Sequence, residues 1–299
     1  MHLDLYVNTL GKHLKARFGQ TVRKLTLHAG FTCPNRDGTV ARGGCTFCNI
    51  RSYSGGNARV SIEEQLAQRR QEMKRASLYM AYFQAYTSTY GEVEELRRLY
   101  DEATRQADIV GLCVGTRPDC APDTVLELLA DYRRRGYEVW LELGLQSAND
   151  AALERVNRGH GFAEYADAVM RAHRYEVPVC THLILGLPGE SRDDYLATHA
   201  RVLELGVAGL KLHPLLIVKG SAMAADYARG ELQPPELDDY AAVAAEIIRR
   251  TPREVVFHRV TGTAREPMLI APSWGHTSWP AIHTICSHLI RDGHQGDAL

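Results

Sequence analysis

The sequence predicts an α/β protein built as a partial (β/α)6 TIM-like barrel of parallel strands with a C-terminal α/β extension. Short apolar, β-branched runs alternate with amphipathic helical stretches, a pattern typical of βαβ units. Six such units end near residue 220, whereas a complete eightfold barrel needs about 250 residues. Motif-rich stretches follow the predicted strands, at the end where parallel α/β folds gather their active sites.

Each predicted strand is a short apolar run, and each interval between strands shows helical periodicity. The predicted strands are residues 22–28, 78–86, 109–115, 138–146, 177–186 and 209–218. The predicted helices are residues 61–75, 92–107, 122–135, 149–157, 162–175 and 190–205. Ser191-x-x-Asp194 is typical of a capping box at the start of the last of these helices.

The chain divides into a core and an extension. Residues 1–220 form the predicted core, in which a basic N-terminal segment, residues 1–20, precedes the barrel. Residues 221–299 are expected to pack on the barrel, with a helix near 236–250, a strand at 254–260 and a last helix near 279–291.

Composition excludes several classes of protein. The 299 residues are 45% hydrophobic and 24% charged, a globular balance that argues against disorder. The net charge of -1 gives no case for a nucleic-acid or membrane partner. No run approaches the ~18 apolar residues that span a bilayer. The N-terminus lacks the basic start and apolar core of a signal peptide, so we expect a cytoplasmic protein.

Charge is nevertheless uneven along the chain. Residues 1–59 contain nine basic and two acidic residues, a local balance of +7. A basic segment of this kind can hold an anionic partner. The alternative, which charge alone favours, is a solvated surface.

Three of the seven cysteines form a cluster with the spacing C-x11-C-x2-C: Cys33, Cys45 and Cys48. Thiolates suit zinc, Cu(I) or iron–sulfur centres. Structural zinc normally needs four protein ligands, and His28 is the only close extra candidate. Three thiolates on a 4Fe-4S cluster leave one iron open, and we favour this interpretation over zinc or chance. The other cysteines are expected to be inert and buried: Cys113, Cys120, Cys180 and Cys286.

Further motifs end or follow the later strands. They are Phe83-Gln84-Ala85-Tyr86-Thr87, Gly115-Thr116-Arg117-Pro118-Asp119, Glu142-Leu143-Gly144-Leu145-Gln146-Ser147, Asn157-Arg158-Gly159-His160 and Leu183-Ile184-Leu185-Gly186-Leu187-Pro188-Gly189-Glu190. With the cysteine cluster, they resemble the radical S-adenosylmethionine (SAM) superfamily over about residues 20–220. The usual cysteine spacing there is C-x3-C-x2-C. The longer first gap is similar to the group of the elongator-complex catalytic subunit, and the joint pattern to its YhcC/YtqA-type subfamily.

This resemblance implies a 4Fe-4S cluster on the three cysteines, whose open iron binds SAM. One electron then cleaves SAM to methionine and a 5′-deoxyadenosyl radical, which abstracts hydrogen from substrate. The electron is expected from a donor such as flavodoxin or ferredoxin. The protein orients the cofactors and excludes water.

The resemblance also implies SAM contacts at Phe47, Thr87, Glu142, Gln146, Arg158, His182 and Ile184. Phe47 and Ile184 match positions beside the adenine, and Gln146 and His182 match positions at the ribose. Thr87 matches the turn that binds the SAM amino group, and Glu142 ends strand four with Gln146. Arg158 matches a position facing the SAM carboxylate, where a guanidinium fork suits a planar anion.

Three of these residues have a plain structural alternative. Glu142 can be a solvated strand end, and Arg158 can cap the C-terminus of a helix. His182 alone is more often a hydrogen-bonded core histidine than a ligand.

Lys211 and His213 are the candidate catalytic residues. They flank Leu212 on the sixth strand, so alternation puts both on one face. Facing inward, they can hold an anionic substrate or relay a proton. Facing outward, Lys211 is a solvated charge.

Three functions remain open at this point. The first is a radical SAM enzyme that modifies tRNA, at a wobble uridine, with the RNA held by the basic N-terminal segment. The second is a radical SAM enzyme acting on a small metabolite or a protein side chain. The third is a zinc-stabilised binding protein without chemistry.

Overall fold

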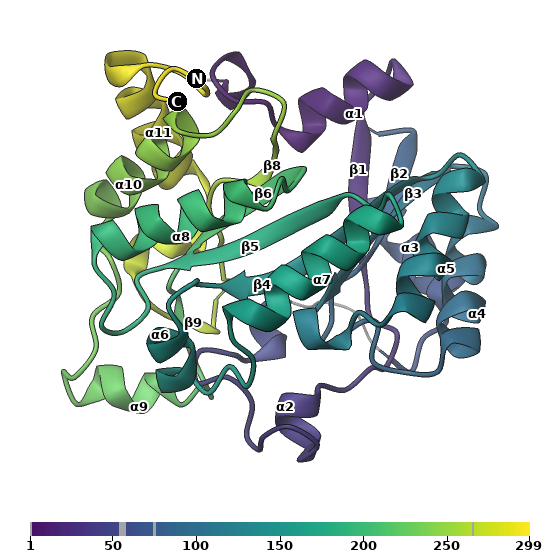
Figure 1. Cartoon of the computed structure of the whole chain (residues 1–299), viewed down its shortest axis with the longest axis horizontal. Coiled ribbons are helices and arrows are strands. Elements are labelled where there is room, and N and C mark those ends of the chain that lie inside the picture. The colour runs from purple at the N-terminus through teal and green to yellow at the C-terminus, as the bar shows by residue number, and fades with distance from the viewer. Residues whose placement is uncertain (1, 54–57, 74–75, 265) are drawn as a thin grey trace.

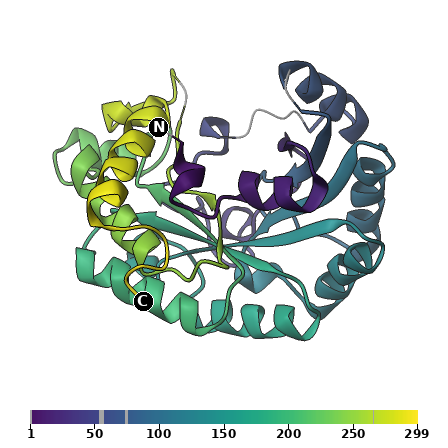
Figure 2. The ribbon, with the colours of Figure 1, turned by 90° about the horizontal axis from the view of Figure 1, so that it is seen from above.

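The computed structural model of the chain describes residues 2–53, 58–73, 76–264 and 266–299. Seven parallel strands form one curved sheet in the order β1-β2-β3-β4-β5-β6-β8 (Figure 1). They are β1 (Val22–Leu27), β2 (Leu78–Phe83), β3 (Ile109–Thr116), β4 (Glu138–Gln146), β5 (Val179–Leu185), β6 (Gly209–Pro214) and β8 (Val256–Arg259). Seen from above, helices line the outside of an open half-barrel (Figure 2). The predicted partial barrel is therefore confirmed.

The helices between strands lie close to their predicted positions. They are α3 (Ile62–Glu72), α4 (Val93–Thr104), α5 (Asp123–Arg134), α6 (Asp150–Arg155), α7 (Phe162–Arg174) and α8 (Arg192–Glu204). The capping box at Ser191 is confirmed, since its side chain accepts a hydrogen bond from Asp194 N. The predicted end of the helix at 61–75 includes residues 74–75, which lie outside the described residues.

The C-terminal segment adds a strand to the main sheet. β8 pairs in parallel with β6, with Val256 opposite Gly209. Two helices of the same segment, α10 (Leu237–Arg249) and α11 (Trp279–Asp292), pack against each other, and α10 also contacts α8. The sheet thus has one strand more than the six predicted for the core.

The single strand predicted at residues 209–218 is wrong in its second half. β6 ends at Pro214, and the chain then forms β7 (Ile217–Val218). β7 pairs antiparallel with β9 (Leu269–Ala271) in a separate two-stranded sheet. A proline has no N–H for the ladder, which favours the break at this point.

Helix α1 (Leu10–Phe18) was not predicted, and it closes the N-terminal end of the barrel. Leu10 and Leu14 pack in one apolar cluster with Val22 and Val256, the first residues of β1 and β8. Its sequence signals are a Thr9 N-cap and a left-handed Gly19 C-cap. The basic residues of this helix therefore lie at the end of the barrel opposite the strand C-termini.

Within the described part of the chain, none of the helices is both long and apolar enough to cross a membrane.

Candidate active site

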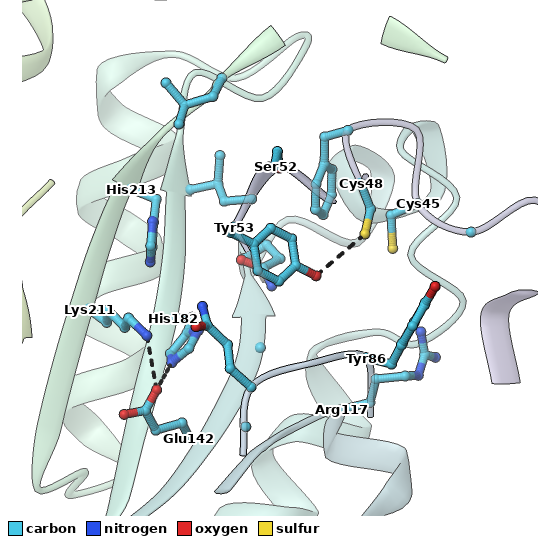
Figure 3. Close-up of a pocket in the computed structure, with 18 of the residues that line it drawn as sticks. Cys45, Cys48, Ser52, Tyr53, Tyr86, Arg117, Glu142, His182, Lys211 and His213 are labelled. Atoms are coloured by element: carbon cyan, nitrogen blue, oxygen red, sulfur yellow. Dashed lines mark hydrogen bonds and ion pairs between the residues drawn. The ribbon is translucent and has the colours of Figure 1, made fainter. Parts of the chain in front are cut away.

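A pocket opens inside the half-barrel at the C-terminal ends of the strands. Its wall contains residues that end four different strands: Thr116, Gln146, Pro214 and Arg259. The cysteine loop, residues 33–48, borders one end, and a cluster of charged side chains borders the other (Figure 3). This position agrees with the edge that the predicted motifs indicated.

The cysteine loop brings its three cysteines to the same pocket. Cys33 precedes the short helix α2 (Pro34–Asp37), and Cys48 N donates to Cys45 O in a tight turn, at 2.9 Å. The loop is held by the chain after α6. Thr46 N donates to Val156 O at 3.0 Å, and Asn157 Nδ2 donates to Gly44 O at 2.9 Å. The cysteines therefore rest on a folded support.

Polar groups surround the sulfur atoms. Cys45 Sγ accepts from Arg158 Nη1 at 3.4 Å and from Asn35 Nδ2 at 3.5 Å. Cys48 Sγ lies 3.8 Å from Tyr53 Oη. Burial raises the pKa of the Cys48 thiol. A metal that binds Cys48 as a thiolate must therefore displace a firmly held proton.

Arg158 does not cap a helix, so that alternative is wrong. Its buried guanidinium donates from Nη2 to Gly144 O on β4 and from Nη1 to Cys45 Sγ. A Cβ on Gly144 would lie only 2.8 Å from Arg158 Nη2, so a glycine is needed for this approach. Arg158 Nε is buried without a partner among the described residues. Arg158 thus joins β4 to the cysteine loop and leaves its Nε free to donate.

The carbonyl group of Arg158 is held by a second arginine that we did not assign from the sequence. Arg117 Nη1 donates to Arg158 O at 2.8 Å. Its Nε and Nη2 donate to the two carboxylate oxygens of Asp119, at 2.9 and 2.7 Å. Arg117 and Arg158 belong to the motifs at residues 115–119 and 157–160, but only the structure shows that Arg117 positions Arg158.

The other residues expected at SAM also line the pocket. Thr87 Oγ1 is buried without a partner among the described residues, and Thr87 N donates to Thr32 O at 3.2 Å. Phe47 and Ile184 are partly buried in one apolar cluster beside the pocket. Gln146 has a φ of 82°, a left-handed conformation that is strained for a residue with a side chain.

Glu142 is fully buried, so the solvated strand end is wrong. Its Oε1 accepts from Lys24 Nζ and lies 2.9 Å from His258 Nδ1. Its Oε2 lies 3.0 Å from Lys211 Nζ and 2.8 Å from His182 Nε2. Burial alone would raise the pKa of this carboxyl, but Lys211 and Lys24 outweigh burial and hold the pKa well below its usual value. Glu142 is therefore an anion inside the barrel.

Lys211 and His213 face the barrel interior (Figure 3). Burial, together with Lys211, lowers the pKa of His182 to about 4, and burial holds the pKa of His213 well below its usual value. Both rings are therefore neutral at pH 7. Burial lowers the pKa of Lys211 to about 8, although Glu142 opposes this shift.

The remaining cysteines are buried as predicted: Cys113, Cys120, Cys180 and Cys286. Burial raises the pKa of Cys113 and of Cys120 to about 12, which suppresses their reactivity. His28, the candidate fourth zinc ligand, has its Nδ1 occupied by a hydrogen bond from Gly30 N at 3.1 Å.

We predict that Glu142→Gln destabilises the protein at pH 7 by about 3–5 kcal/mol, because the buried Lys211 and the partly buried Lys24 lose their counter-charge. A carboxyl group whose pKa is lower in the folded than in the unfolded protein stabilises the folded state at a pH above the unfolded pKa. This stabilisation is lost as the pH falls through the folded pKa. The difference between variant and wild type should therefore shrink in acid. Urea unfolding at pH 7 and at pH 3 measures it, with the exposed Glu95→Gln as control. Equal stability of Glu142→Gln and wild type at pH 7 would contradict the prediction.

The chain was compared with known proteins. The radical SAM superfamily matches residues 33–202, and the Radical_SAM C-terminal domain matches residues 207–291. YhcC of Escherichia coli (strain K12) is 54% identical over 100% of this chain and 97% of its own length. YtqA of Bacillus subtilis (strain 168) is 38% identical, over 96% of this chain and 90% of its own length.

Two further similarities are partial. A tRNA uridine(34) acetyltransferase of Dehalococcoides mccartyi is 30% identical over 57% of this chain and 36% of its own length. The solved structure of the archaeal Methanocaldococcus infernus Elp3 shares the fold, with a TM-score of 0.64 at 17% identity. The match covers 92% of this chain and 64% of that chain. From the family match and the full-length relatives, the chain belongs to the radical SAM superfamily and to its YhcC/YtqA-type subfamily.

Proposed function

We propose that this pocket binds a 4Fe-4S cluster beside SAM and that the enzyme abstracts a hydrogen atom from a substrate held in the barrel. Radical SAM enzymes use these two cofactors. The observation that carries the proposal is a convergence in one pocket. Three cysteines lie there with two buried polar atoms that have no partner among the described residues, Thr87 Oγ1 and Arg158 Nε.

The cysteine loop fits a cluster of this kind. Cys33, Cys45 and Cys48 supply three thiolates, and hydrogen bonds from Arg158 and Asn35 to Cys45 Sγ suit a sulfur that carries negative charge. When bound, the cluster supplies the electron that cleaves SAM to methionine and a 5′-deoxyadenosyl radical. A small one-electron donor such as flavodoxin or ferredoxin is the proposed source of that electron.

The chain's own residues bind and orient SAM. Arg158 pairs with the SAM carboxylate, and Thr87 accepts from its amino group. Gln146 holds the ribose, and Phe47 and Ile184 enclose the adenine. His182 and Glu142 lie deeper. Burial and Lys211 keep His182 neutral although Glu142 opposes this shift, and Glu142 orients the ring through the hydrogen bond from Nε2.

We predict that Cys33→Ala, Cys45→Ala and Cys48→Ala each lose the 4Fe-4S absorbance and SAM cleavage while the protein stays folded. Removing one thiolate opens a second iron to solvent. Iron content, circular dichroism and 5′-deoxyadenosine production after anaerobic reconstitution check this. Cys286→Ala, a buried cysteine of α11, is the matched control and should keep its cluster. Full iron content in all three variants would place the cluster elsewhere.

Arg158→Ala should weaken SAM binding about tenfold or more, since a charge-assisted pair in a partly buried site contributes about 1.5–3 kcal/mol. Calorimetry on the reconstituted protein measures the affinity, and iron content shows whether the cluster persists. Arg155→Ala is the control, because Arg155 lies on the preceding helix and bonds to Pro188 O at the surface. Unchanged affinity in Arg158→Ala would leave Arg158 with a structural role only.

We propose tRNA as the first candidate substrate, at a wobble uridine. One partial relative is named as acting on uridine 34 of tRNA. The expected docking on residues 1–20 does not suit this function, because α1 lies at the opposite end of the barrel from the pocket. Arg42 and Arg51, which are exposed beside lining residues Gly44 and Ser52, are better placed. We therefore propose that RNA contacts the rim of the pocket around Arg42 and Arg51, and not residues 1–20.

A small metabolite or a protein side chain is the second candidate. The observation that favours it is the charged interior of the pocket. Lys211 is buried inside the pocket and Arg259 is an exposed lining residue beside it, and a neutral nucleobase neutralises neither cation.

Charge reversal at two surfaces separates these candidates. The double variant Arg42→Glu/Arg51→Glu should bind tRNA more weakly than wild type, with a log–log salt slope smaller by about one to two. Lys12→Glu/Lys15→Glu on α1 is the matched control and should bind as wild type does. Filter binding between 50 and 200 mM salt, with all variants at equal fold, measures both. If the α1 variant alone loses affinity, or if the wild type binds no tRNA, the rim proposal fails and the small-substrate candidate stands first.

A further inference from the structure

We propose that Lys211, His213 and Arg259 form a subsite for an anionic group of the substrate, a carboxylate or a phosphate. The subsite lies at the floor of the pocket, the part lined by Glu142 and Lys211, with the exposed Arg259 beside it. The proposal rests on the proposed function only in taking this pocket as the place where the substrate reacts. The proposal gives the chemical class of the substrate group that reaches the floor of the pocket.

The floor carries more positive than negative charge. Among the described residues that line the pocket, Glu142 is the only acidic side chain, whereas Lys211 and Arg259 both reach the lining. Lys24 on β1 and Lys211 both pair with the carboxylate of Glu142. The single negative charge of Glu142 therefore neutralises at most one of these two lysines. Lys211 is buried, whereas Arg259 is exposed. A buried ammonium group that shares its only counter-charge is costly unless a ligand supplies the missing charge.

Hydrogen-bond donors of the floor also remain unused. Lys211 Nζ donates to Tyr82 Oη at 2.7 Å and to Glu142 Oε2 at 3.0 Å, which leaves one of its three protons. In the described part of the chain, the side chains of His213 and Arg259 make no hydrogen bond or ion pair. The His213 ring packs closely against Gly262, where an added Cβ would lie 2.4 Å from Nδ1.

A cation is a poor alternative ligand for this end of the pocket. Ligand atoms of Glu142, Cys180 and His258 do lie within 4.8 Å of one another. Both oxygens of Glu142, however, are already paired with the ammonium groups of Lys24 and Lys211. Two ammonium groups bound to the same carboxylate repel a metal ion, whereas they attract an anion.

The protonation of Lys211 adds a pH dependence. Burial lowers the pKa of Lys211 to about 8. The groups that face it come from every strand around it: Lys24, Tyr82, Cys113, Glu142, Cys180, His182, His213, His258 and Arg259. Lys211 is charged below pH 8 and neutral above it, so anion affinity should fall as pH rises through about 8.

Thermal unfolding of the full chain, purified anaerobically, tests the subsite with inorganic phosphate and with succinate at constant ionic strength. We expect a saturable rise in Tm for wild type, stronger at pH 7 than at pH 9, because a ligand that binds the native state stabilises it. Arg259→Gln should weaken the apparent affinity about tenfold or more. Arg259→Lys should retain part of it, and Lys15→Gln on α1 should respond as wild type. The anion that binds with the higher apparent affinity, phosphate or succinate, identifies the anionic group of the substrate.

An unsaturable response shared by wild type and Arg259→Gln would overturn the proposal, since it reports only general salt effects on the surface. If Arg259→Gln does not fold, His213→Gln decides by the same criterion. Because this assay needs no SAM cleavage, its outcome is independent of the proposed reaction. A chain that binds the anion but cleaves no SAM would contradict the proposed function alone.

Discussion

The interior of the barrel is organised by one buried carboxylate. Glu142 is held by Lys24, Lys211, His182 and His258, which come from β1, β6, β5 and β8. Buried ion pairs contribute little net stability, because desolvation offsets the attraction, and an apolar interior of the same size is often as stable. A charged interior is therefore better explained by a ligand that needs it than by the fold.

Strand β4 links this carboxylate to the cysteine loop. Alternate residues of a strand face the same side, so Glu142, Gly144 and Gln146 all meet the interior. Glu142 orients the floor, Gly144 receives Arg158 at its carbonyl, and Gln146 turns into the pocket in a left-handed conformation. Arg158 in turn contacts Cys45 Sγ. Strand β4 thus positions both the Glu142 cluster and the cysteine loop at the two ends of the pocket, and its register determines the distance between them.

Local pattern predicted much of this arrangement. Residues 138–146 were expected as a strand and form β4, because a buried parallel strand is a continuous apolar run. The cysteine spacing and the motifs after each strand identified residues that line one pocket. Strand alternation also allowed Lys211 and His213 to share one face, although it did not show that this face is the inner one.

Features set by distant contacts were not predictable in the same way. β8 joins the sheet only because its partner β6 has a free edge, and Arg259 reaches the pocket for that reason. The four partners of Glu142 come from strands up to 118 residues away along the chain. Net charge over residues 1–59 was equally ambiguous. It merges α1, at the closed end of the barrel, with Arg42 and Arg51 beside the pocket.

The most direct test is an anaerobic crystal structure of the chain reconstituted with iron and sulfide and soaked with SAM. We predict a four-iron cluster on Cys33, Cys45 and Cys48, with the SAM carboxylate on Arg158 and the floor around Lys211 left free for substrate. A single zinc ion on these cysteines, or SAM bound away from Arg158, would contradict it.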